Sequence, residues 1–455
     1  MKRLVVFGGA CSLAAYVALA LSQAPLGSPL FFAIVAVPCV VYTLVVRGLL
    51  APAASTPSSP SALRQRRVFL AALLLALAFR APLLVHSVGA TSDMVRYLYD
   101  GRVQRLGLNP YTIVPSDPAL AWTLTNQTRR MPSRNDRSPY GAAAQLFFRL
   151  VVTIHEGTRT MKLALVACDL LTIAVLIAWL RAAGRDDWLV LMYAWNPLVV
   201  LEIAHSGHID ALGLLLTAVS AWMLSTKRGM RAAVAFALAV ATKLLPIVLL
   251  PLYWKRIRIR DAAVGVLALA AVYLPFASAG TVPLGAVPNV VAVVRFNGPV
   301  FKALAALLSP RGAAGCAVLA GLAAAAAMRS RRTVDDPAAW AWPMAVALAA
   351  APVIYPWYLL TFTPFLTTIP VAALSTWSIS VLPVYLVWDL SRHGHRWIVP
   401  WWLLSVEYGA LGIVLIVTIV RAVQRKPTFV NVPVGASERP NALDSTSSSE
   451  TGRLE

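Results

Sequence analysis

The chain is poor in charged residues, and poorest in acidic ones. Only 13% of its 455 residues are charged, and 19 aspartates and glutamates stand against 40 lysines and arginines. Hydrophobic residues make up 59% of the sequence, which is more than water-soluble domains contain. A soluble enzyme or a soluble binding domain is therefore excluded.

Cysteine is also scarce, and two kinds of sequence feature are missing. The four cysteines, Cys11, Cys39, Cys168 and Cys316, each lie in an apolar segment without a close partner, so we interpret them as small core hydrophobes. No Gly-x-x-x-x-Gly-Lys-Ser/Thr loop is present, so a nucleotide as an energy source is not indicated. No internal repeat is found, which disfavours a transporter built from matching halves.

Long apolar runs recur along the whole chain. Each is about twenty residues long, enough to cross a hydrocarbon core of roughly 30 Å. The first could also be a signal peptide, but an uncleaved span starts a consistent topology. With the N-terminus inside, we predict an all-α polytopic membrane protein with about twelve crossings, at 4–22, 29–46, 68–85, 161–181, 187–204, 209–225, 261–277, 311–328, 337–354, 357–369, 371–388 and 401–421.

The net charge of +21 does not indicate nucleic-acid binding, because the basic residues lie in short turns between the spans. This pattern marks those turns as cytoplasmic. The segment 232–254 is apolar, has basic clusters on both sides and is interrupted by Lys243-Leu-Leu-Pro246. One full crossing would place one of these clusters outside, so we predict a re-entrant hairpin. Lys243 itself is expected toward the inner half, as a cation that extends to the interface.

These segments give a domain plan. Residues 1–425 form one transmembrane domain with a cytoplasmic linker at 50–67, which is rich in Pro, Ser and Ala. Two stretches are expected outside, a large loop at 86–160 and a second loop at 278–300. The polar tail 426–455 is predicted to be a disordered cytoplasmic segment.

Ionisable residues gather at the start of the first outer loop. On a helix from about 92 to 107, one face carries Asp93, Arg96, Tyr97, Asp100 and Gln104. Asp93 could simply cap an interfacial helix. However, Arg96, Arg102 and Arg105 lie on the side where the positive-inside trend disfavours cations, which indicates an anion such as a lipid phosphate.

Two further groups fall at the outer ends of spans. One contains Glu202, His205, His208 and Asp210. Ionisable residues are costly there and often functional. The two histidines could share a metal, or the group could bind substrate, handle protons or form a structural polar turn.

The second group is aromatic, with Tyr355, Trp357 and Tyr358. Such rings form belts at membrane interfaces. They could also form a wall for a sugar, because flat rings pack on pyranose faces.

Taken in order, these pieces resemble the bacterial polyprenol-phosphate-dependent glycosyltransferases of the membrane-embedded C superfold (GT-C), and most closely the polyprenol phosphomannose-dependent mannosyltransferases. The resemblance covers about residues 68–410. Its motifs are Asp93-x-x-Arg-Tyr-x-x-Asp-Gly-Arg102, Gly107-x-Asn-Pro-Tyr111, Ser138-Pro-Tyr140, Trp195-Asn-Pro197, Gly207-His-x-Asp210, Thr242-Lys-x-x-Pro246, Phe296-Asn-Gly298 and Tyr355-Pro-Trp-Tyr358.

The resemblance implies a polyprenyl-phosphate sugar donor, inversion at the anomeric carbon and an acidic base in the first outer loop, which falls on Asp93. The chain departs from the family pattern at Ser92, where many members have a second acid, and at Ala142, where a proline is common.

We therefore expect an inverting hexosyltransferase, with mannose as the expected sugar, in the inner (plasma) membrane. Its active site is expected on the periplasmic or extracellular side, and both termini are expected in the cytoplasm. Its partners would be the lipid-linked donor, a glycan or lipid acceptor and membrane lipids, with no nucleic acid and no cofactor. The rivals are a lipid-linked glycan flippase or transporter, an O-antigen-type ligase or polymerase and a non-catalytic assembly protein. Donor phosphate would meet Arg96, Arg102 and Arg105. The expected substrate-binding residues are Tyr97, Asp100, Asn109, Tyr111, Tyr140, Glu202, His205, His208, Asp210, Tyr355, Trp357 and Tyr358.

Overall fold

The computed structural model of this chain is built from helices. It describes residues 3–50, 62–85, 93–131, 133–277, 283, 285–368 and 371–424. Within these ranges there is no strand, and the only β contact is an isolated bridge between Phe296 and Val353. The predicted all-α polytopic class is confirmed. Most of the linker 50–67, the start of the outer loop and the tail 426–455 lie outside the described residues.

Eight of the described helical segments are long and apolar enough to cross a membrane. Five are single helices, and three join consecutive helical elements. Their labels and bounds are η1 (Leu4–Gly8) with α1 (Gly9–Ser22), α2 (Pro29–Leu50), α3 (Ala62–Val85), α6 (Thr158–Ala182), α11 (Ile259–Tyr273) with η7 (Leu274–Phe276), α14 (Pro310–Arg331), α16 (Ala372–Ser380) with η10 (Leu382–Tyr385) and α17 (Leu386–Arg392), and α18 (Trp401–Gln424).

A pair of helical segments, Asp187–Ala194 and Pro197–His205, is bent by 56° between them and is either a broken ninth span or a re-entrant loop. The other predicted crossings correspond to shorter apolar segments, so the number of long spans is smaller than the twelve read from hydropathy. Hydropathy does not distinguish a lipid-facing span from a short apolar helix enclosed by other helices. The bent pair consists of η4 (Asp187–Val190), α7 (Leu191–Ala194), α8 (Pro197–Val200) and η5 (Leu201–His205). The shorter segments are α9 (Asp210–Ser225), α15 (Ala338–Ala349) and η8 (Pro356–Phe365), and α10 (Gly229–Thr242) belongs to the segment predicted as a hairpin.

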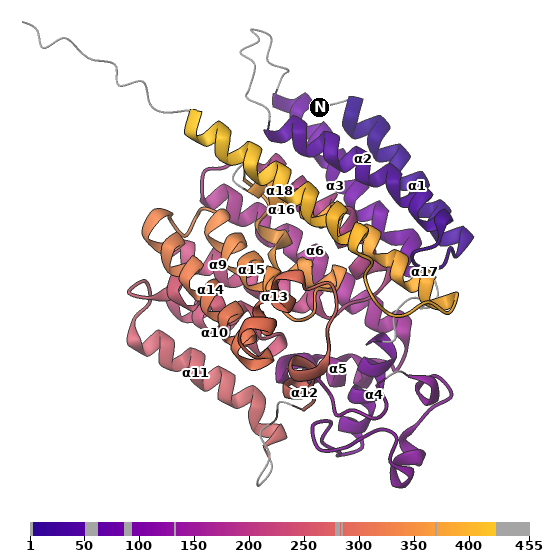
Figure 1. The fold of residues 1–455 in the computed structure, drawn as a ribbon. Helices are drawn as coiled ribbons and strands as arrows, with labels where there is room; N and C mark the ends of the chain where they lie inside the picture. Colours follow the sequence, from indigo (N-terminus) through magenta and orange to yellow (C-terminus); the bar gives the residue numbers. More distant parts are fainter. Residues whose placement is uncertain are drawn as a thin grey trace, which may run out of the picture.

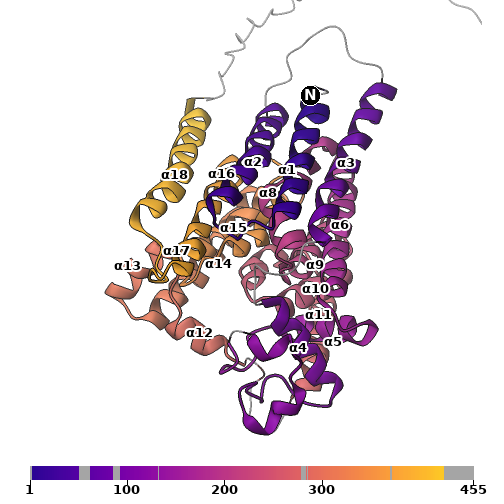
Figure 2. The same cartoon turned by 90° about the vertical axis from the view of Figure 1, so that its right-hand side faces the viewer.

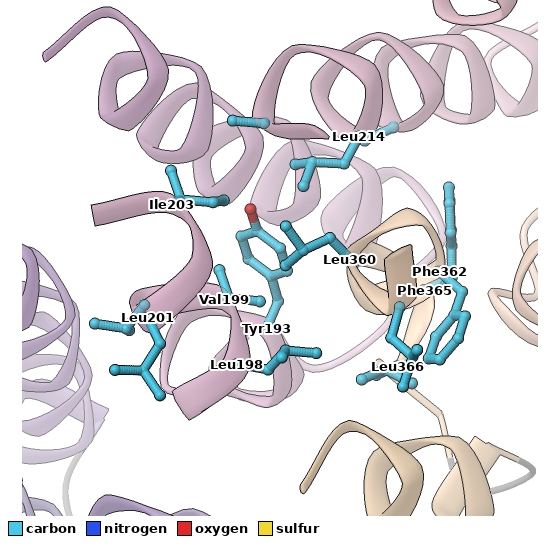
Figure 3. Packing of buried hydrophobic residues seen from close by; sticks show 14 of the residues in the cluster. Tyr193, Leu198, Val199, Leu201, Ile203, Leu214, Leu360, Phe362, Phe365 and Leu366 are labelled. Atoms are coloured by element: carbon cyan, nitrogen blue, oxygen red, sulfur yellow. The ribbon is translucent and has the colours of Figure 1, made fainter. Parts of the chain in front are cut away.

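The short segments form the centre of the molecule. Helix α9 packs against α6, α10 and η8, and α15 packs against α14 and η8. Figure 3 shows side chains of the bent pair, α9 and the 360–366 segment pointing toward one another, and those it labels are buried. Inside a membrane such packing gains little from the hydrophobic effect, so dispersion contacts between well-fitted side chains hold the elements together.

The segment 232–254 is a hairpin, as predicted. Helix α10 ends at Thr242, the backbone is extended at Lys243, and the 3-10 helix η6 (Leu245–Tyr253) returns. Pro246 has no N–H to donate to the carbonyl oxygen of Thr242, so α10 does not continue through this point, and the proline instead occupies the first turn of η6. The basic residues that flank both ends of the segment line one basin. The hairpin therefore enters and leaves on the same side, and Lys243 lies at its tip.

The described part of the loop predicted to lie outside (86–160) packs at one end of the bundle. Figure 2 shows the ends of α2 and α3 near residues 50 and 62 at the opposite end from α4 (Asp93–Arg105) and α5 (Ala142–Ile154), which pack on each other. The short elements η2 (Pro118–Thr123) and η3 (Thr128–Arg130) follow α4. Helix α12 (Val287–Val293) lies in the second loop, 278–300, and α13 (Pro299–Leu307) begins at its end (Figure 1).

Helix α4 is more enclosed than a helix lying flat at a membrane interface. Its polar residues Arg96, Asp100 and Gln104 are buried together with its apolar ones. The reason is that the chain after α4 folds back over its polar face: Arg96 donates to the carbonyl oxygens of Ser133 and Asp136 at 2.9 and 3.0 Å.

Candidate active site

One cavity of about 570 Å³ lies where the outer loop, the hairpin tip and the start of η8 meet. Its lining combines a few ionisable side chains with an aromatic side and an apolar side. The ionisable residues are Asp93, Asp210 and Lys243; the aromatic ones are Tyr97, Tyr140, Tyr273, Tyr355, Trp357, Tyr358, Trp388 and Trp397; and the apolar ones include Val240, Leu244, Leu245, Val287, Val291, Val294 and Leu348. Pockets of this composition are suited to an amphipathic ligand.

Asp93 is the first residue of α4, and its side chain is 33% exposed toward this cavity. Burial raises the pKa of its carboxyl group, and the negative charge of Asp210 raises it further, while His208, Lys243 and the Tyr140 hydroxyl act in the opposite direction. A carboxylate with a raised pKa is a stronger base than an ordinary aspartate. This position suits a group that accepts a proton from a bound hydroxyl.

Behind Asp93, His208 lies between two carboxylates. Its Nδ1 is 3.7 Å from Oδ2 of Asp93, and its Nε2 is 3.2 Å from Oε2 of Glu202. The Tyr385 hydroxyl donates to the other oxygen of Glu202. Histidine and glutamate are both fully buried. Neither ring nitrogen of His208 makes a hydrogen bond within the described residues, so the ring is held by the close approach of the two carboxylates and by packing.

Two local features hold His208 in place. Its ring stacks on Trp357, with centroids 4.3 Å apart and planes 12° from parallel. The preceding Gly207 has φ +79°, and a Cβ there would lie 2.0 Å from Cε of Met94. Glycine therefore suits the left-handed backbone conformation at this position, whereas the end of the flexible Met94 side chain could move aside.

Lys243 and Asp210 form an ion pair at the hairpin tip. The Lys243 ammonium also lies 4.1 Å from the centroid of the Tyr358 ring, which is a cation–π contact. Sequence analysis expected Lys243 toward the inner half of the membrane, whereas the structure places it in the cavity with Asp93. The available signal was the motif Thr242-Lys-x-x-Pro246, whose break puts residue 243 at a tip.

The aromatic side of the cavity is a stacked group. Tyr355 and Trp357 lie parallel at 4.5 Å, and Trp388 packs edge-on to both rings. Trp388 and Trp397 were not among the predicted site residues; they pack on each other at 4.6 Å. Nothing in the local sequence pattern distinguishes them from interfacial tryptophans.

The three arginines predicted to bind phosphate do not line the cavity. Arg96 pairs with Asp100 at 2.8 Å inside the loop. Arg102 and Arg105 lie near the carboxylate of Glu156, at 3.1 and 3.9 Å. The acidic partner is four residues along the same helix for Arg96 and follows α5 for Arg102 and Arg105.

Other predicted residues support the loop rather than face the cavity. Asp100 accepts hydrogen bonds from Ser138 and Gln145 at 2.5 and 2.9 Å. Asn109 donates to the carbonyl oxygen of Phe276, and the Tyr111 hydroxyl to that of Tyr140. His205 is buried in the turn before His208. Among the described residues, no three His, Cys, Asp or Glu side chains are grouped as a metal site.

Gly141 makes the contact between the outer loop and the hairpin tip. A Cβ at this position would lie 2.1 Å from the carbonyl oxygen of Ala241, a backbone atom that cannot rotate away. The cavity geometry therefore depends on a glycine at the start of α5.

We predict that Gly141→Ala will lower the thermal unfolding midpoint of the protein in detergent. It should also lower the rate of any reaction that takes place in the cavity. Overpacking of this kind costs about 1–3 kcal/mol. Gly315→Ala is the matched control, because it adds the same methyl group within α14, where no atom lies within 4 Å. Equal midpoints for the two variants would contradict the proposed close contact.

Comparison with known proteins assigns the chain to a family. The model of the family described as alpha-(1->6)-mannopyranosyltransferase, N-terminal domain, matches residues 4–256, which is more than half of the sequence. The chain belongs to this mannosyltransferase family. The matched region contains Asp93, Glu202, His208, Asp210 and Lys243, whereas the aromatic side from Tyr355 onward lies beyond it. No curated protein and no solved structure matches the chain.

Membership in this family makes the protein a multi-pass membrane glycosyltransferase. The substrates of a glycosyltransferase are a sugar donor and an acceptor that provides a nucleophile. In a mannosyltransferase family, the sugar is mannose. The resemblance stated from the sequence motifs is thereby confirmed at the level of the family.

Proposed function

We propose that this protein transfers mannose from a polyprenyl-phosphate donor to a hydroxyl group of a glycan or lipid-linked acceptor, with inversion, on the outer face of the plasma membrane. The observation that supports this most strongly is the cavity itself. It combines a carboxylate of raised pKa, a lysine and an aromatic side with an apolar side of valines and leucines. Transfer of a sugar from a lipid-linked sugar phosphate would use all four of these features of the cavity.

Asp93 acts as the general base. It accepts the proton of the acceptor hydroxyl while that oxygen attacks the anomeric carbon of mannose. The bond between this carbon and the phosphate oxygen breaks, and the electron pair leaves with the polyprenyl phosphate. Attack from the face opposite the leaving group inverts the anomeric configuration. No covalent intermediate with the enzyme is required, because phosphate is already a good leaving group.

Lys243 stabilises the phosphate in this proposal. It is the basic side chain among the cavity-lining residues of the described chain, whereas Arg96, Arg102 and Arg105 are paired elsewhere. Charge on the phosphate grows as the glycosidic bond breaks, and a fixed ammonium group lowers the energy of that state. Asp210 holds the ammonium in place before the donor binds.

The aromatic and apolar sides of the cavity match the sugar and the lipid tail of the donor. Tyr355, Trp357 and Tyr358 present rings on which a pyranose can pack. The valines and leucines from α10, η6 and α12 provide an apolar surface for the first isoprene units.

His208 and Glu202 position the base. His208 lies behind Asp93 and keeps its raised pKa from rising further, and Glu202, which accepts the Tyr385 hydroxyl, lies against the other ring nitrogen of His208. These residues lie beneath the cavity surface, so their role is exerted through Asp93 rather than by contact with substrate.

A pH profile tests this arrangement. The base must be ionised to act, so kcat/KM should rise with pH through the raised pKa of Asp93. His208→Gln removes the cation that opposes the shift, and we expect the acidic limb to move up by about one pH unit. His205→Gln makes the same change three residues away and should leave the limb in place. A limb unmoved by His208→Gln would contradict the positioning role.

The function itself is tested with membranes that contain the protein and a panel of polyprenyl-phosphate hexoses. We expect transfer from the mannose donor and none from nucleotide-linked mannose. Movement of the intact lipid-linked sugar across the bilayer without transfer would instead indicate a flippase.

A further inference from the structure

A second cavity lies at the base of the hairpin, away from the tip that carries Lys243. The turn that follows α9 and the turn between η6 and α11 enclose a basin of about 740 Å³. We call it the basal basin. Its lining residues are Lys227, Arg228, Gly229, Met230, Arg231, Lys255, Arg256, Ile257, Arg258, Arg260 and Asp261.

The basal basin concentrates positive charge. Seven of its eleven lining residues are lysine or arginine, and Asp261 is the one acid among them. The Asp261 carboxylate already accepts the backbone N–H of Arg258 at 3.2 Å and lies 3.7 Å from Nε of Arg260. It therefore neutralises little of the remaining charge. Like charges gathered in one concave surface repel each other unless an anion binds between them.

Two of the lysines occupy backbone positions that favour glycine. Lys227 has φ +60° and Lys255 has φ +59°, one in each of the two turns. A side chain in this left-handed region is strained by comparison with glycine. Lysine at both positions is consistent with a requirement for its charge at this surface, beyond the general preference for basic residues in cytoplasmic turns.

The surroundings of the basal basin point to a lipid as the source of the anion. Exposed apolar side chains border it: Met230 and Trp254 are 46% and 67% exposed, and Ile259 is 87% exposed. Val266 and Leu267 continue this surface along α11. A phospholipid could place its phosphate in the basin and its acyl chains along α11, and basic pockets beside spans bind anionic headgroups in this way. A free anion would make no use of the apolar border.

We propose that the basal basin binds the headgroup of an anionic phospholipid of the cytoplasmic leaflet, and that this lipid anchors the hairpin whose tip presents Lys243 to the cavity. Binding requires no assumption about the reaction. Only the expected effect on transfer rests on the proposed function.

Binding is tested with the full-length protein in detergent by native mass spectrometry and by titration with a fluorescent phosphatidylglycerol. The variant Lys227→Gln/Arg228→Gln/Arg231→Gln removes three exposed charges from the basin. The matched control Arg47→Gln/Arg66→Gln/Arg67→Gln removes three exposed charges at the facing ends of α2 and α3. Phosphatidylcholine tests whether the lipid must be anionic. Inorganic phosphate tests whether a free anion displaces the lipid.

We expect saturable binding of phosphatidylglycerol to the wild type and the control, at least tenfold weaker binding to the basin variant, and no displacement by millimolar phosphate. Equal binding to both variants would overturn the proposal, as would full displacement by phosphate or equal binding of phosphatidylcholine. In nanodiscs, transfer should then increase with phosphatidylglycerol content in the control and not in the basin variant. Loss of transfer in every sample, with binding retained, would reject the proposed function and leave the lipid site standing.

Discussion

Replacing Asp93 by Asn should lower mannose transfer by about 10²–10⁴-fold while the protein still folds and binds its donor. Asn has nearly the same shape but cannot accept a proton from the acceptor hydroxyl, and general-base catalysis contributes an effect of this size. The measurement is the initial rate with polyprenyl-phosphate mannose in membranes that contain equal amounts of each protein.

The same substitution should leave thermal stability unchanged or raise it. Because the pKa of Asp93 is raised in the folded protein, its ionised form is disfavoured on folding, and this cost is present at neutral pH and disappears at low pH. An uncharged Asn does not have this cost. Asp117→Asn is the matched control, since Asp117 is an exposed acid of the same loop whose capping role Asn can keep. A fully active Asp93→Asn protein would refute the base assignment.

Removing the Lys243 charge should weaken donor binding by about tenfold to a hundredfold, because a hydrogen bond to a charged group is worth about 1.5–3 kcal/mol. Lys243→Met alone would leave Asp210 without its cation, so the double variant Lys243→Met/Asp210→Asn is the cleaner test. Lys243→Arg should retain part of the affinity. Binding is measured with a short-chain polyprenyl-phosphate mannose, whose phosphate is intact.

Arg102→Gln provides the comparison for Lys243. Arg102 is a cation of the same outer region, but it pairs with Glu156 and does not line the cavity. We expect its removal to leave donor affinity within about twofold, as for most partly exposed charges. Weaker donor binding to Arg102→Gln, with unchanged binding to the Lys243 double variant, would contradict the role of Lys243. It would instead support phosphate binding by the arginines that sequence analysis favoured.

Three of the candidate site residues illustrate how far sequence reasoning reaches. Asp93 was found because a carboxylate directly after a span is unusual. His208 and Glu202 were found for the same reason, as costly groups at the outer end of a span. Their arrangement was not predictable, because residues 93 and 208 are far apart in the sequence and meet only when α4 packs over the turn at Gly207.

The sequence by itself determined the class of the protein, its basic turns, the hairpin and the motifs of its family. These follow from composition, hydropathy and short-range pattern, which are properties of one segment at a time. Only the tertiary structure decided that Lys243 faces the cavity, that the three arginines do not, and that His208 lies between two carboxylates. Periodicity specifies which residues share a helix face, but the neighbour opposite that face is chosen by packing between distant segments.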